Sequence, residues 1–247
     1  MTREPALVRL GRFAEDQWGL VTRREAVVAG VSAATMARLI DRGDLERVAH
    51  GVFHLRGAPM PDLAALRAAW LQLAPGVPAW QRSADQGVVS HRSAAAVFGL
   101  GHLPADVHEF TLPARRQSRR GDVRLHVRPL TADEWVTVAG LPVTRPARTA
   151  ADLLVDREDS EAIAHVIADA IRGRVETPGS FAAALGPLAS RRGLPRGDGC
   201  ALLGWLLDLV GDPETGRWLD EARTRPGAAR SAAPAARPSP GGAGTRR

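Results

Sequence analysis

The chain has 247 residues, enough for one large domain or two smaller ones, and its 45% hydrophobic and 24% charged residues are ordinary for a globular protein. No apolar run is long enough to cross a membrane, and the single cysteine, Cys200, excludes an intrachain disulfide and a thiolate zinc site. We therefore expect a cytoplasmic protein that contacts no membrane.

The charge is distributed unevenly along the chain. All 33 basic residues are arginine, and the net charge is +6. Residues 222–247 contain six arginines and no acid, so the whole excess lies there, in an Ala/Pro/Gly/Arg mixture that predicts a disordered tail. Arginines outnumber acids in residues 1–57 and 82–148, whereas residues 149–221 have seven arginines against thirteen acids. A basic front and an acidic back suit two different partners.

The front of the chain begins with two predicted helices. An amphipathic helix is expected over residues 6–18. Thr22 followed by Glu25 has the spacing of a capping box, and it predicts a short helix that ends at Gly30.

A third helix and a hairpin complete this unit. Ser32 is placed to cap a helix over residues 33–41, and residues 45–55 alternate in polarity around a turn at His50 and Gly51. This order predicts a winged helix-turn-helix, which places its second helix in the major groove of DNA. The alternative is a small helical domain used for protein contacts alone.

Nine residues are the candidates for DNA contact. Thr35 and Arg38 on the second helix of the motif are expected to reach base edges, and basic residues beside it are expected to meet phosphates. The full set is Arg23, Arg24, Ser32, Ala33, Thr35, Arg38, Arg42, Arg47 and His50.

The rest of the chain predicts a mixed region. A helix over residues 59–73 and a Pro-Gly break at 75–78 form a connector over residues 58–81. Residues 82–221 predict an α/β domain, with strands at 88–89, 107–112, 123–127, 135–138 and 141–143 and helices at 90–98, 146–155, 161–172, 178–188 and 200–209. The predicted class is α+β: a winged helix-turn-helix over residues 1–57, the connector, the α/β domain and the tail over residues 222–247.

Several runs of this sequence resemble a known bacterial family. Residues 18–24, 30–32 and 42–53 resemble the N-terminal domain of AbiEi-type antitoxins, the transcription-regulating halves of type IV toxin–antitoxin pairs. Residues 88–95, 98–101 and 140–153 resemble the second domain of the same family. The chain departs from the family at Ala33-Ala34, where basic residues are frequent, and at Phe53, where an aromatic pair containing Tyr is usual.

The resemblance implies a function for each half. The N-terminal domain would bind double-stranded DNA at the protein's own promoter and repress its operon. The second domain would counteract a nucleotidyltransferase-like toxin encoded nearby. Two alternatives stay open: a stand-alone winged-helix transcription factor with a ligand-sensing or dimerising second domain, and a nuclease-related enzyme.

Six arginines of the second domain are further candidates for a partner or for nucleic acid. Arg115, Arg116, Arg119 and Arg120 lie between two predicted strands, where they form either a nucleic-acid or nucleotide contact or a solvated hairpin tip. Arg145 and Arg148 lie at the start of a predicted helix, where the helix dipole does not favour cations. We expect these two to pair with acids inside the domain or to face an anionic partner.

No catalytic residue, metal site or cofactor is expected. Ser90 and His91 are adjacent, which favours a helix cap followed by a packed histidine over a nucleophile and its base. His102, His108 and His126 lack the spacing of metal ligands, and the acids at residues 152–161 predict a charged loop between helices.

Overall fold

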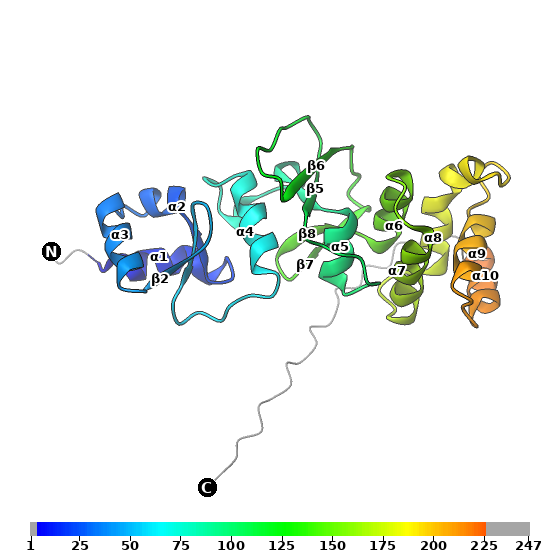
Figure 1. The fold of residues 1–247 in the computed structure, drawn as a ribbon, viewed down its shortest axis with the longest axis horizontal. Helices are drawn as coiled ribbons and strands as arrows, with labels where there is room; N and C mark the ends of the chain where they lie inside the picture. The colour runs from blue at the N-terminus through cyan, green and yellow to red at the C-terminus, as the bar shows by residue number, and fades with distance from the viewer. Residues whose placement is uncertain (1–3, 226–247) are drawn as a thin grey trace, which may run out of the picture.

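The computed structural model describes residues 4–225, which form three packed regions arranged along the long axis of the molecule (Figure 1). We call them the winged-helix region (residues 6–55), the sheet region (residues 64–144) and the helical region (residues 146–224). Helices and two β-sheets together confirm the α+β class. Within residues 4–225, no helix is both long and apolar enough to cross a membrane.

The winged-helix region has the predicted order of elements. These are α1 (Ala6–Glu15), β1 (Leu20–Thr22), α2 (Arg23–Val28), α3 (Ala33–Asp41), β2 (Leu45–Ala49) and β3 (Val52–Leu55). The three strands form an antiparallel sheet in the order β1-β3-β2. The side chains of Leu10, Val21, Met36 and Phe53 are buried in one cluster, which fixes α3 against the sheet.

Local caps explain why α2 and α3 begin where they do. The backbone N–H of Glu25 donates to Thr22 Oγ1 at 3.2 Å, and the Thr22 N–H donates to Glu25 Oε2 at 2.7 Å, which confirms the predicted capping box. Gly30 has a φ of +67°, as expected for the residue that ends a helix. The Ser32 hydroxyl accepts from the Thr35 N–H at 3.2 Å and caps α3.

The sheet region surrounds a five-stranded mixed sheet. Its elements are α4 (Ala64–Leu73), the 3₁₀ turns η1 (Ala79–Gln81) and η2 (Ala84–Gln86), β4 (Val88–Val89), α5 (His91–Phe98), β5 (His108–Leu112), β6 (Val123–Val127), β7 (Trp135–Val138) and β8 (Leu141–Thr144). The strand order is β6-β5-β4-β8-β7, and the pairs β5–β6 and β4–β8 are parallel. Helix α4 begins later than residue 59, because Leu63 takes a left-handed φ of +53° that a helix does not accommodate.

Helix α4 joins the first two regions and is more than a connector. Its Trp70 is buried in one cluster with Leu20 and Val52 of the winged-helix region and with Phe110 of the sheet. At the same junction, Trp18 Nε1 donates to the carbonyl oxygen of Ala139 at 2.8 Å. The winged-helix region and the sheet region therefore share a hydrophobic core.

The helical region contributes most of a second hydrophobic core, to which α5 of the sheet region adds Ala95. Its elements are α6 (Pro146–Val155), α7 (Ser160–Arg172), α8 (Pro178–Leu185), the 3₁₀ helix η3 (Gly186–Arg192), α9 (Gly199–Leu209) and α10 (Thr215–Thr224). Helix α10 is not predicted by the sequence pattern, and it buries Trp218 and Ala222. Residues 222–224 are thus the end of a helix, and the rest of the predicted tail, from residue 226, lies outside the described residues.

Candidate nucleic-acid interface

The outer face of α3 carries the predicted base-reading residues. Arg38 is exposed, and its Nη2 donates to Thr35 Oγ1 at 3.2 Å, so the two side chains form one polar patch. Ala33 is exposed at the start of the helix and offers a methyl group rather than a hydrogen bond. The Ser32 hydroxyl already caps the helix. Thr35 and Arg38 therefore present the polar side-chain groups on this face of α3.

Five arginines of the winged-helix region are exposed and have no ion pair within residues 4–225. They are Arg23, Arg24, Arg38, Arg42 and Arg47. Arg23 and Arg24 stand at the start of α2, Arg38 and Arg42 at the end of α3, and Arg47 on the wing strand β2. Guanidinium groups without internal carboxylates are available for phosphate oxygens.

Hydrogen bonds connect the turn of the wing to α2 and α4. His50 is exposed at this turn, and its backbone carbonyl accepts from Gln72 Nε2 of α4 at 2.6 Å. The adjacent Gly51 carbonyl accepts from the Arg23 N–H at 2.8 Å. The wing, the start of α2 and α4 thus form one continuous surface.

This geometry agrees with what the chain's sequence is similar to. Residues 8–55 match the family model for transcriptional regulators described as AbiEi antitoxin. The matched AbiEi segment runs from α1 to the end of β3, which is the winged-helix region, and the family is one of regulators rather than of enzymes. No curated protein matches the chain.

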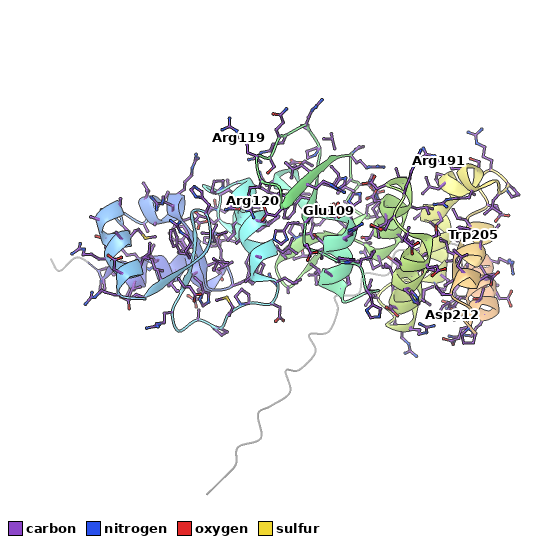
Figure 2. All side chains as sticks on the ribbon, viewed as in Figure 1. Glu109, Arg119, Arg120, Arg191, Trp205 and Asp212 are labelled. Atoms are coloured by element: carbon purple, nitrogen blue, oxygen red, sulfur yellow. The ribbon has the colours of Figure 1, made fainter. Side chains whose placement is uncertain are left out.

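Outside the AbiEi match, the arginines at residues 115–120 lie in a crossover loop. The hairpin tip that the sequence left open is wrong, because β5 and β6 are parallel. Arg115, Arg116 and Arg119 are exposed and have no ion pair among the described residues, whereas Arg120 pairs with Asp122. Arg119 and Arg120 are labelled in Figure 2.

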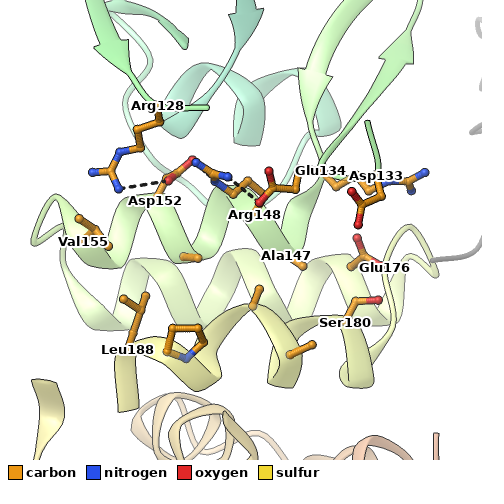
Figure 3. Close-up of a pocket in the computed structure, with 15 residues that line it drawn as sticks. Arg128, Asp133, Glu134, Ala147, Arg148, Asp152, Val155, Glu176, Ser180 and Leu188 are labelled. Carbon is orange, nitrogen blue, oxygen red and sulfur yellow. Dashed lines mark hydrogen bonds and ion pairs between the residues drawn. The ribbon is translucent and has the colours of Figure 1, made fainter. Parts of the chain in front are cut away.

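Arg148 lies in a different environment, beside a cavity of about 450 Å³. Its guanidinium donates to Asp152 Oδ2 at 2.9 Å and to Glu134 Oε1 at 2.6 Å, and burial raises the pKa of Asp152 against the opposing effect of Arg148. Figure 3 shows these charged groups on the side of the cavity that faces the sheet, with Leu188 across from them. Arg145 also lines the cavity, and its backbone N–H donates to the Glu134 carbonyl at 2.8 Å.

The fold also brings together two histidines that are far apart in the sequence. The rings of His91 and His126 stack with centroids 3.6 Å apart and planes at 13°. Asp156 Oδ2 lies 3.6 Å from His91 Nε2 and 3.5 Å from His126 Nδ1. His126 Nε2 and Glu109 Oε2 form a hydrogen bond of 2.7 Å. No spacing in the sequence indicates this cluster, because its members come from α5, β5, β6 and the residue after α6.

The chemistry of this cluster follows from its burial and orientation. Because the ring planes are nearly parallel, the in-plane lone pairs do not converge on one point, as coordination of a single metal ion would require. Burial and the neighbouring His126 lower the pKa of His91 to about 2. Ser90 Oγ bonds to His91 Nδ1 at 2.9 Å instead of capping α5 as predicted, and Ser90 is fully buried, out of reach of a substrate.

Proposed function

We propose that the protein is a DNA-binding transcriptional repressor that binds its own promoter through the winged-helix region, with α3 in the major groove. The observation that carries this proposal is the set of five exposed arginines that form no ion pair within residues 4–225, on the segment that matches the AbiEi regulator family. Arg38 beside Thr35 reads bases, while Arg23, Arg24, Arg47 and His50 contact phosphates.

We further propose that the sheet and helical regions counteract a nucleotidyltransferase-like toxin encoded beside this protein. The antitoxin description of the matched family and the resemblance of residues 88–101 and 140–153 to its second domain support this division of labour. The sheet and helical regions also offer a surface whose acidic half suits a basic partner.

Promoter binding tests the first proposal. Replacing Arg38 and Arg42 with alanine removes one base contact and one contact at the end of α3. We expect the affinity for the DNA upstream of the protein's own gene to fall on the order of 10- to 100-fold, since a specific contact contributes about 1–3 kcal/mol. Fluorescence anisotropy with a labelled promoter fragment measures this effect.

A matched control removes the same charge elsewhere. Arg191 and Arg192 are exposed on η3 of the helical region, so their double alanine variant should bind the promoter like the wild type. If the Arg38→Ala, Arg42→Ala variant binds as tightly as this control, α3 is not the helix that enters the groove.

Growth protection tests the second proposal. The full chain is required, because the winged-helix region shares a core with the sheet. Cells that express the neighbouring toxin gene should be rescued by the wild type and equally by the Arg38→Ala, Arg42→Ala variant. If rescue is lost together with promoter binding, protection is transcriptional and the proposed division of labour is wrong.

One observation favours a second candidate function, a transcription factor that senses a small molecule. The cavity beside Arg148 combines an apolar wall with charged groups, and its volume lies in the range of ligand sites. A neighbourhood without a nucleotidyltransferase-like gene would favour this candidate over the antitoxin.

A further inference from the structure

The loop between β5 and β6 connects two neighbouring parallel strands. Parallel neighbours need a connection that returns to the starting end of the sheet, and here ten residues, 113–122, do so without helix or strand. Residues 113–119 are exposed, and they include Arg115, Arg116 and Arg119. The first acid in the loop is Asp122, which is bound by Arg120. The outer part of the loop therefore has a net charge of +3.

One side chain connects this loop to the wing. The Gln72 amide nitrogen donates to the carbonyl oxygen of His50, and the Gln72 amide oxygen accepts from Arg120 Nη1. Arg120 is itself fixed, because its Nε donates to Asp122 Oδ1 at 2.8 Å. The side chain of Gln72 therefore bridges the turn of the wing and the base of the loop over residues 113–122, which we call the arginine loop.

A further arginine, Arg82, lies at the end of α4. Its guanidinium donates to the carbonyl oxygens of Trp70, Leu71 and Ala74 at 2.6–2.7 Å and so caps the helix. Burial lowers the pKa of Arg82 to about 10; the charge of Glu25 opposes this effect and the charge of Arg116 adds to it.

The end of α4 in turn lies beside α2. In the turn that follows α4, a Cβ on Gly76 would lie 3.7 Å from the Arg24 side chain. Arg24 of the winged-helix region therefore lies beside the turn that follows α4, the helix whose end Arg82 caps.

We infer that residues 113–122 form a second phosphate-binding surface, continuous with the wing, so that one DNA duplex contacts both the winged-helix region and this loop. This inference rests on the proposed DNA-binding function and extends it to the sheet region. Exposed arginines on an irregular loop suit contacts with phosphates, which add affinity without reading sequence. A basic loop beside the wing favours DNA over a protein partner, because a duplex bound as proposed would also lie against Arg24 and His50.

A triple alanine variant at Arg115, Arg116 and Arg119 tests this inference in the full chain. The control is the triple alanine variant at Arg191, Arg192 and Arg196, which removes the same charge from exposed positions on the helical region. Arg119 and Arg191 lie on different parts of the molecule, on either side of the sheet and α5 (Figure 2).

The expected readout is the dependence of DNA affinity on salt. Each phosphate contact contributes about 0.9 to the slope of log K against log salt, so the loop variant should lose roughly 2 to 3 from this slope. Its affinity should fall by a similar factor for promoter and unrelated DNA, with an unchanged melting temperature. The control variant should keep the wild-type slope.

Two results would overturn the inference. A loop variant with the slope of the control, in a protein that prefers its promoter, would reject the loop contact alone. Wild-type DNA binding of the loop variant combined with lost growth protection would assign the loop to the toxin instead. A wild type without any preference for its promoter would overturn the proposed function.

Discussion

Arginines on the outer face of the winged-helix region and arginines inside the sheet and helical regions lie in different environments. In the winged-helix region, Arg23, Arg38 and Arg42 are exposed and have no ion pair among the described residues. In the sheet and helical regions, Arg92 lies 2.5 Å from Glu158 and Arg148 bonds to two carboxylates. Since every cation of the chain is arginine, residue type cannot separate the two groups. The two groups of arginines differ in whether a carboxylate of the protein lies beside the guanidinium.

The difference in pairing corresponds to a difference in energetic role. Asp152 is 2% exposed and forms ion pairs with Arg148 and Arg128. Removing one partner of such a pair leaves a buried charge uncompensated, whereas removing an exposed, unpaired arginine changes little within the folded protein. Paired arginines should therefore govern stability, and unpaired ones should govern binding.

The largest expected effect is the loss of stability when an ion-paired arginine is removed. Arg148→Ala should lower the free energy of unfolding by about 3 kcal/mol, because Asp152 loses its closest cation. Chemical denaturation measures this, and Arg42→Ala is the control, with an expected change within about 0.5 kcal/mol. The double variant Arg148→Met, Asp152→Leu should recover much of the loss, since it leaves neither of those two charges without its partner. Equal effects of Arg148→Ala and Arg42→Ala would remove the distinction between the two groups.

The sequence predicted the winged-helix region well because its determinants are local. The capping box of Thr22 and Glu25, the positive φ of Gly30 and the cap at Ser32 each depend on residues within four positions. Helix α3 has the predicted bounds, and the wing turns at the predicted residues.

The parts that the sequence did not predict depend on distant contacts. Helix α10 has few apolar residues, and the burial of Trp218 against the neighbouring helices defines it. The parallel pairing of β5 and β6 cannot be deduced from their alternation, so the arginine loop looked like a hairpin. The stacking of His91 on His126 requires the sheet order itself.

The residues of the candidate interface were likewise only partly predictable from the sequence. Positions in the helix-turn-helix and in the loop made Arg24, Arg38 and Arg116 candidates, whereas Arg148 was expected either to pair with acids inside the domain or to face an anionic partner. The structure separates them, because the carboxylates of Glu134 and Asp152 meet Arg148 only after β7 and α6 have packed.

The most direct test of this account compares two double variants that each remove two positive charges. Arg23→Ala, Arg24→Ala takes away unpaired arginines at the start of α2, and Arg92→Ala, Arg128→Ala takes away arginines paired with Glu158 and Asp156. Promoter affinity of both is measured over a range of salt, with the melting temperature of each protein. The account predicts that the first variant loses about 2 from the salt slope at an unchanged melting temperature. It predicts that the second melts lower and keeps the wild-type slope. Equal loss of slope in both variants would contradict it.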